Sequence, residues 1–303
     1  MLQQTQVATV IPYYNKFVDT YPDLKSLSKA SLDELMMLWS GLGYYRRIKN
    51  IYLAAQIISR KYDNKFPRDY EDILSLPGIG RTTASAISTF SGYSHRAILD
   101  GNVKRILRRY FNISYENNSK TEKILWEKSI FVTPLKKTSQ FIQAMMDIGS
   151  LVCTRSKPNC MMCPLKELKC LYTEDVQKIS KNKKNIKKIN MYLLTLINSL
   201  DEVYLEKIKS GMLWENLYSG PFFYSATKMN LWLKKKRISA AKITNKFEIS
   251  HRVTNKDIKI TNYVYFLKNN KKVSLSTENW YNLAKINVGI PKYFDKAIKL
   301  YRS

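Results

Sequence analysis

Residues 76–100 read LPGIGRTTASAISTFSGYSHRAILD, and this stretch decides the fold of the first half of the chain. It opens with a turn at residues 76–80, in which Gly78 and Gly80 flank one apolar residue. Glycine lets a backbone approach a partner closely and turn its N–H groups outward. Apolar residues then recur at helical spacing as far as Phe90, which predicts a short amphipathic helix. A helix N-terminus behind such a turn predicts an anion-binding site.

The chain carries a large excess of positive charge. Lys and Arg total 51 against 24 acidic residues, a formal net charge of +27 over 303 residues. Such a field favours a polyanionic partner, so the anion expected at the turn is a DNA phosphate. Lys, Asn, Ile and Tyr are all abundant, however, and this compositional bias makes charge alone weak evidence. Apolar residues make up 45% of the chain, which allows real cores and excludes global disorder.

The sequence gives no sign of a membrane segment. It has no run of about eighteen apolar residues and no basic head followed by an apolar stretch, so we expect neither a membrane span nor a signal peptide. All four cysteines lie between positions 153 and 170. Such clustering suits a metal site in a reducing compartment better than a disulfide framework. We therefore expect a cytoplasmic protein.

Residues 1–152 scan almost entirely as helix. Residues 1–17 read as the middle of a helix without an N-cap, which indicates either a frayed terminus or a chain that begins inside an element. Ser31 and Glu34 form a capping-box pattern before a leucine-rich helix. Glycines at 41 and 43 end that helix, and apolar periodicity resumes from Ile48. The first half is therefore predicted to be all-α.

The pattern changes after the cysteines. Residues 173–190 are rich in lysine without a sustained core pattern, which predicts an exposed linker and a domain boundary. Beyond it, residues 191–197 and 202–208 read as strands around a turn, and residues 262–267 and 272–276 read as a hairpin. Helices are predicted at 226–236 and 292–301. The second half is therefore a smaller α/β domain.

The four cysteines follow the spacing Cys153-x6-Cys160-x2-Cys163-x6-Cys170. Zinc and iron–sulfur clusters both take four thiolate ligands. A single C-x2-C pair, instead of two, favours a cluster over a zinc ribbon. Several basic residues lie in or beside the loop, which suits contact with phosphate but also fits a solvated surface loop.

Seven segments together carry a family resemblance: LQQTQV, WSGLGYY, LPGIGRTTASAI, ILDGNVKR, QAMMDIGS, CTRSKPNC and MMCPL. The chain resembles the adenine DNA glycosylases (MutY-type) of the helix-hairpin-helix, Gly/Pro/Asp base-excision superfamily, closely over residues 1–170 and more faintly beyond. The resemblance implies an all-α helix-hairpin-helix glycosylase domain with an iron–sulfur cluster loop at 1–172. A basic linker at 173–190 and a smaller α/β, Nudix-like lesion-recognition domain at 191–303 would follow.

The resemblance implies hydrolysis of the N-glycosidic bond of adenine mispaired with 8-oxoguanine or guanine, after the adenosine is flipped out of the duplex. Asp100 matches the carboxylate that stabilises the sugar cation, although a helix cap is an equally physical role for it. Asn102 matches a residue that supports that site. The four cysteines would hold a [4Fe–4S] cluster, with six residues in the last gap where the family usually has five.

Several positions match DNA-contacting residues of the family: Gln3, Gln4, Leu42, Tyr44, Gly78, Gly80 and Lys104. Without the family, Leu42 and Tyr44 would read equally well as core residues. The lesion-reading triplet falls at residues 253–255, where only Asn255 keeps a polar side chain suited to that role, and no Nudix box is present. The expected partner is duplex DNA with a mispaired adenine. We expect a nucleoid-associated monomer with no membrane partner.

Two features set limits on the expected activity. Thr82 stands where the bifunctional glycosylase/lyases carry a catalytic lysine, which argues against the competing reading, a lyase for oxidised pyrimidines. The family's general-acid Glu lies two residues before the Met of the first motif, and that Met is Met1 here. If the protein truly starts at Met1, we therefore expect very little adenine excision. The alternative function is a catalytically impaired protein that binds DNA lesions.

Overall fold

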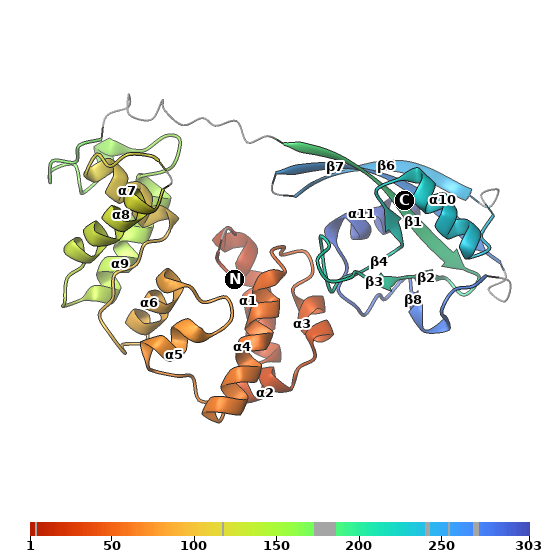
Figure 1. Cartoon of the computed structure of the whole chain (residues 1–303), viewed down its shortest axis with the longest axis horizontal. Coiled ribbons are helices and arrows are strands. Elements are labelled where there is room, and N and C mark those ends of the chain that lie inside the picture. Colours follow the sequence, from red (N-terminus) through yellow and green to blue (C-terminus); the bar gives the residue numbers. More distant parts are fainter. Residues whose placement is uncertain (4, 117, 173–185, 240–242, 254, 269–272) are drawn as a thin grey trace. The chain divides into compact units, whose positions relative to one another are not determined.

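The computed structural model describes residues 1–3, 5–116, 118–172, 186–239, 243–253, 255–268 and 273–303 (Figure 1). The chain divides into two compact units. The central unit comprises Ile57–Lys183, and the discontinuous unit comprises Met1–Gln56 together with Lys184–Ser303. The grouping of the two ends of the chain was not foreseen from the sequence, and the predicted domain boundaries stay a prediction.

The central unit is helical. It receives the end of α4 (Arg46–Tyr62) and continues with α5 (Tyr70–Ser75), α6 (Arg81–Phe90), α7 (Gly101–Tyr110), α8 (Ser119–Val132), α9 (Thr138–Asp147), a π-helical turn η1 (Ile148–Val152) and a 3₁₀ turn η2 (Cys160–Met162). Val103 and Leu107 on one face of α7 are buried with Leu125 of α8 and Ile142 of α9. These apolar side chains form the core on which α7 presents its N-terminus.

The N-terminal part of the discontinuous unit contains α1 (Val7–Thr20), α2 (Leu24–Lys29) and α3 (Leu32–Leu38). The prediction of helix from residue 1 was wrong, because α1 begins only at Val7 and Gln6 makes no side-chain cap. The capping box of α3 is confirmed. Ser31 Oγ accepts from the Glu34 N–H at 3.2 Å, and the Glu34 carboxylate accepts from the Ser31 N–H at 2.7 Å.

The C-terminal part contains a mixed sheet of order β6-β7-β1-β2-β8, with β5 also paired to β1 and a small separate pair β3–β4 (Figure 1). The strands are β1 (Lys187–Asn198), β2 (Glu202–Tyr204), β3 (Glu206–Lys207), β4 (Tyr218–Ser219), β5 (Phe222–Phe223), β6 (Ile243–Val253), β7 (Lys256–Leu267) and β8 (Trp280–Asn282). The helices are α10 (Ala226–Lys235) and α11 (Lys292–Arg302), as predicted, with a 3₁₀ turn η6 (Thr277–Asn279) between β7 and β8.

The first strand of the predicted hairpin, residues 262–267, is confirmed as part of β7, but the predicted pairing with residues 272–276 was wrong; residues 269–272 lie outside the described residues. Strand β7 forms its hairpin with β6, a strand that the sequence reading missed, and residues 273–276 form no strand. Residues 187–190 of the predicted linker are the start of β1, while residues 173–185 lie outside the described residues. The turn between β1 and β2 is as predicted, with Ile197 opposite Val203.

Strand β1 is the centre of three layers. Its register with β7 is parallel and continuous from Lys187 to Asn198. Leu193 and Ile197 are buried with Phe294 of α11, whereas Leu194 and Leu196 are buried with residues of α10. A strand covered on both faces needs a continuous apolar run, which explains why its second half is apolar almost throughout.

Within the discontinuous unit, residues 1–56 pack on the C-terminal part. Asp33 accepts from Lys207 at 2.5 Å and from the Tyr218 hydroxyl at 3.1 Å. Ile208 and Leu217 are buried in the same core as Trp39. We call this contact, made by Asp33, Lys207 and Tyr218 above that core, the α3 junction. None of the helices in the described ranges is long and apolar enough to span a bilayer.

Candidate active site

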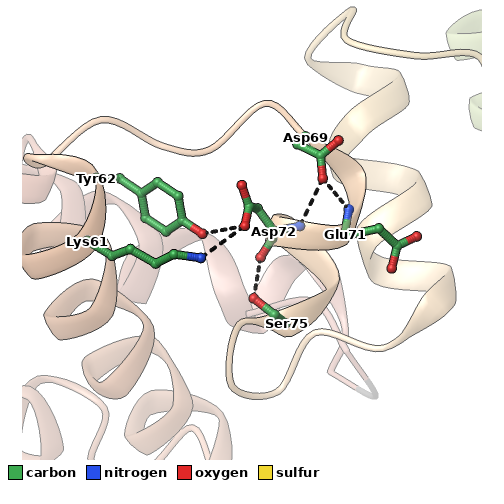
Figure 2. Close-up of polar contacts among 6 residues, drawn as sticks. All are labelled: Lys61, Tyr62, Asp69, Glu71, Asp72 and Ser75. Atoms are coloured by element: carbon green, nitrogen blue, oxygen red, sulfur yellow. Dashed lines mark hydrogen bonds and ion pairs between the residues drawn. The ribbon is translucent and has the colours of Figure 1, made fainter.

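The hairpin formed by α5, its turn and α6 is tied to the end of α4. Asp69 caps α5 by accepting from the N–H groups of Glu71 and Asp72 at 2.9 and 3.2 Å (Figure 2). The Asp72 carboxylate accepts from the Tyr62 hydroxyl at 2.7 Å and from Lys61 at 3.1 Å (Figure 2). These two bonds lower the pKa of Asp72, the larger share coming from Tyr62. Asp72 therefore stays charged at neutral pH and fixes α5 in place.

The turn of the hairpin contains two glycines with different backbone conformations. Gly78 adopts a positive φ of 79°, which side chains other than glycine rarely tolerate. Gly80 is the N-cap of α6 and makes no side-chain cap. Apart from Gly80 itself and its two neighbours in the chain, no described residue has an atom within 4 Å of the point where a Cβ at Gly80 would stand. The N-terminus of α6 is thus open to an approaching anion.

Asp100 caps α7 with one oxygen of its carboxylate. Its Oδ1 accepts from the N–H groups of Asn102 and Val103 at 3.0 and 2.8 Å. Its Oδ2 accepts a longer bond of 3.3 Å from the Asn102 side-chain amide. The helix cap weighed as an alternative is therefore real, and it fixes the carboxylate rotamer. The half-buried carboxylate stands at the positive end of the helix dipole, which stabilises its negative charge.

Asn102 connects Asp100 to the cysteine loop through Arg105. Arg105 Nη2 donates to Asn102 Oδ1 at 2.9 Å, and Arg105 Nε donates to the Cys153 carbonyl at 2.7 Å. Burial lowers the pKa of Arg105. Arg105 also donates to the Gly149 carbonyl, where a Cβ on Gly149 would stand 2.5 Å from Asn102 Cβ. Only glycine at position 149 lets η1 approach the start of α7 this closely.

Arg109, one turn after Arg105, organises the cysteine loop. Arg109 is 3% exposed, and its guanidinium donates to the carbonyls of Cys153, Thr154 and Arg155 at 3.2, 2.8 and 3.1 Å. It also donates to Cys153 Sγ at 3.1 Å and lies over the Tyr172 ring at 4.7 Å. A buried guanidinium with this many acceptors sets the path of the loop backbone.

All four cysteines line one small cavity of about 30 Å³, together with Arg109. None of the four is in a disulfide. Burial raises the pKa of the Cys170 thiol, and the nearby sulfurs of the other three cysteines raise it further. Across the described ranges, no three His, Cys, Asp or Glu side chains are arranged as a site for a single metal ion.

The glycine loop between α3 and α4 presents Tyr44 and buries Leu42. Gly41, Gly43 and Tyr44 all adopt positive φ values of 92°, 78° and 51°. The Trp39 indole N–H donates to the Gly43 carbonyl at 3.0 Å, and Arg47 lies over the Tyr44 ring at 5.1 Å. Tyr44 is 45% exposed and Leu42 only 6%. Leu42 thus matches the core alternative, and its contact with DNA stays a prediction.

A second, larger cavity of about 1040 Å³ lies within the discontinuous unit. Tyr44, Trp214 and Val253 contribute to its wall, as do five basic side chains: Arg46, Arg47, Lys49, Arg252 and Lys292. His251, also in the wall, packs 5.8 Å from the Trp214 ring and 5.9 Å from the Tyr293 ring. Burial, then Lys292 and Lys296, lower the pKa of His251. This basic cavity is suited to an anionic partner.

The remaining predicted residues occupy varied positions. Gln3 is exposed, lines the basic cavity and accepts from Arg47 at its carbonyl, at 2.8 Å, whereas Gln4 lies outside the described residues. Lys104 is ion-paired to Glu122 of α8 at 2.6 Å. Asn255 lies in the exposed turn between β6 and β7, and its carbonyl accepts from the Lys187 N–H at 2.8 Å. That these residues contact DNA stays a prediction.

Arg105, Arg109 and Glu215 were not predicted as site residues from the sequence. A weak signal existed for the two arginines, because their spacing of four residues puts them on one face of α7. What they contact could not be read from that spacing, because Cys153 lies more than forty residues away in the chain.

Comparison with known proteins agrees with this geometry. Residues 1–129 match the family model of the HhH-GPD superfamily base excision DNA repair proteins. The adenine DNA glycosylase of Buchnera aphidicola subsp. Baizongia pistaciae is 39% identical over 98% of this chain and 86% of its own length. That of subsp. Acyrthosiphon pisum is 38% identical over 100% of this chain and 88% of its own.

Among solved structures, a thermostable thymine-DNA glycosylase is 29% identical, with a TM-score of 0.52 over 57% of this chain and 80% of its own. The hairpin, the capped carboxylate and the near full-length relatives agree with one another. This chain belongs to the adenine DNA glycosylase family of the helix-hairpin-helix base-excision superfamily.

Proposed function

We propose that the chain hydrolyses the N-glycosidic bond of adenine mispaired with 8-oxoguanine or guanine in duplex DNA. The observation that carries the proposal is the Asp100 carboxylate, held at the N-terminus of α7 next to Leu99, whose carbonyl accepts a hydrogen bond from Thr82 of α6. Its relatives of similar length are adenine DNA glycosylases. We expect the enzyme to act as a monomer on nucleoid DNA.

The reaction needs the adenine outside the base stack and a negative charge beside the sugar as the bond breaks. We infer that Gly78 and Gly80 hold a phosphate of the bent strand and that Asp100 stabilises the oxocarbenium ion. Oδ1 is committed to the cap, so Oδ2, with its one long bond to Asn102, is the oxygen that faces the developing charge in this scheme. Asn102 and Arg105 keep that carboxylate in position.

Thr82 supports a hydrolytic rather than a lyase reaction. Its hydroxyl donates to the Leu99 carbonyl at 3.2 Å, one residue before Asp100. A threonine there supplies no amine for a Schiff base, so water is the nucleophile that completes the reaction. We therefore propose a monofunctional glycosylase that leaves an abasic site.

We propose that Cys153, Cys160, Cys163 and Cys170 hold a [4Fe–4S] cluster. Four thiols that line one cavity supply the four thiolate ligands that such a cluster takes. The cluster would supply structural support for the loop beside α7, and Arg109 would donate to its Cys153 ligand. Iron and acid-labile sulfide in the purified protein, at about four each per chain, would support this assignment.

We propose that the C-terminal α/β part is Nudix-like and reads the base opposite the adenine. Its turn at Asn255 and the neighbouring Arg252 and Val253 stand at the end of the β6–β7 hairpin, and the latter two line the basic cavity. Tyr44 lies on the wall of the same cavity. Aromatic and polar side chains in such a cavity suit stacking on, and hydrogen bonding to, a purine.

Single-turnover excision tests the proposal. Duplexes with adenine opposite 8-oxoguanine, opposite guanine and opposite thymine are incubated with excess protein, and strand breaks are counted with and without alkali. We expect alkali-dependent breaks in the first two duplexes only. Breaks without alkali would favour a lyase instead. Tight retention of the 8-oxoguanine duplex without adenine release would favour the lesion-binding alternative.

A further inference from the structure

The wall of the basic cavity contains one acidic side chain among the residues described there. Against its five basic residues stands Glu215, which lies in the loop between β3 and β4. An acid at such a place opposes the electrostatic attraction that would draw a polyanion in. Its contacts indicate what it does instead.

Glu215 is held firmly by its own loop. Its Oε2 accepts from the Gly211 N–H at 2.8 Å, and the Asn216 side-chain amide donates to Oε1 at 3.3 Å. The residues on either side, Trp214 and Asn216, have positive φ values of 63° and 66°. The loop is closed by the Asn216 N–H, which donates to the Ile208 carbonyl at 3.1 Å. The carboxylate is thus presented in one fixed orientation.

The remaining contact of Glu215 crosses to α4. Oε1 accepts from Lys49 Nζ, and the two side chains are 24% and 37% exposed. Lys49 is therefore occupied by a carboxylate while it stands in the wall of a cavity otherwise suited to phosphate. The contacts of Lys49 and Gly211 together lower the pKa of Glu215 to about 2, the larger share coming from Lys49, so the Glu215 carboxylate is charged at neutral pH.

We propose that Glu215 is a positioning residue that holds Lys49 away from DNA phosphates and thereby limits the affinity of the cavity for undamaged duplex. This inference rests on the proposed function, because it takes duplex DNA as the partner of the cavity. Each phosphate contact made by a lysine releases a counterion and adds about 0.9 to the slope of log affinity against log salt. Such contacts do not depend on the DNA sequence, so an enzyme that must dissociate from normal DNA benefits from having fewer of them.

The test is a double-mutant cycle on binding to undamaged duplex, measured by fluorescence anisotropy over a series of salt concentrations. Glu215→Gln keeps an amide oxygen for the Gly211 N–H but removes the charge that holds Lys49. We expect its salt slope to steepen by about 0.9 and its affinity near 0.1 M salt to rise by roughly five- to tenfold. Lys49→Gln alone should leave the wild-type slope unchanged. The double variant should return to that slope.

Asp295→Asn is the matched control. Asp295 is likewise paired with a lysine, Lys299 at 2.7 Å, and its substitution changes the net charge by the same amount, but neither residue lines the cavity. We expect it to leave the slope unchanged. Equal steepening of the salt slope in both acid variants would overturn the inference. A salt slope that is flatter in Lys49→Gln than in the wild type would also overturn it. A folded wild type that binds no duplex at all would instead remove the proposed function, and the inference with it.

Discussion

The Asp100 carboxylate has two roles. Its Oδ1 closes the N-terminus of α7, and in the proposed reaction its charge faces the sugar cation. The two roles can be separated by substitution. Asn is about as good an N-cap as Asp but carries no charge, whereas Ala provides neither.

We therefore expect Asp100→Asn to keep the stability of the folded protein and its DNA affinity, and to lose about 10²- to 10³-fold in the single-turnover excision rate. Asp100→Ala should lose the same activity and, in addition, about 1 kcal/mol in the free energy of unfolding. Denaturant titration and excision assays on both variants check this. Full activity in a stable Asp100→Asn protein would reduce Asp100 to a helix cap.

Two glycines affect neighbouring helices in different ways. Gly149 lets η1 pack closely on α7, and Gly80 leaves the turn before α6 open. At position 149 a Cβ would collide with Asn102, whereas at Gly80 it would meet open space. Gly149→Ala should therefore cost about 1–3 kcal/mol in the free energy of unfolding, as overpacking does, and displace Asn102 from Asp100.

Gly80→Ala is the counterpart. Its φ of −93° suits alanine, so the free energy of unfolding should stay within about 0.5 kcal/mol of the wild-type value. The new methyl group would stand where the phosphate is expected, so duplex affinity should fall. Chemical denaturation and anisotropy distinguish the two variants. Two alanine substitutions of equal effect on stability would contradict the geometry of both sites.

The helices and strands differ in how well the sequence predicts them. Helix α6 and the cap of α7 are local features, set by residues within three positions of each other, and both were predicted correctly. Strand β6 was missed because most of its residues are exposed and its apolar residues are few, so no clean alternation marks it. Residues 273–276 alternate well but form no strand, because strand pairing depends on partners distant in the chain.

At the scale of the whole molecule, the site residues found only in the structure are those joined over long sequence separations. The spacing of the four cysteines alone predicts a metal site, but Arg109 contacts Cys153 across 44 positions, and Lys49 contacts Glu215 across 166. No periodicity encodes such pairs. The packing of residues 1–56 on the C-terminal part was likewise not predictable from the sequence pattern.

The α3 junction leads to a prediction for alkaline pH. Burial, then the Asp33 charge, raise the pKa of Tyr218 from 10.0 to about 12. A tyrosine that loses its proton more easily when unfolded stabilises the fold below pH 10, and this contribution declines as the pH rises from 10 toward 12. Tyr218→Phe removes both the titration and the hydrogen bond to Asp33.

We therefore expect Tyr218→Phe to be less stable than wild type by about 1 kcal/mol at neutral pH, with the difference shrinking above pH 10. Urea titrations of both proteins across that range measure it. The contribution of the other tyrosines cancels in the difference between the two free energies of unfolding. A gap that is constant, or that grows with pH, would mean that Tyr218 is not shielded at the junction.

The discontinuous unit has a consequence for synthesis on the ribosome. Its two segments are separated by the whole central unit, so residues 1–56 emerge first but find their partner strands and helices only after residue 184 has left the exit tunnel. At about 5–20 residues per second, that delay is on the order of ten seconds or more. The central unit is one continuous stretch of chain, so the segments that form it are all synthesised before the second segment of the discontinuous unit. Nascent chains should thus become protease-resistant in the middle before they do so at the beginning.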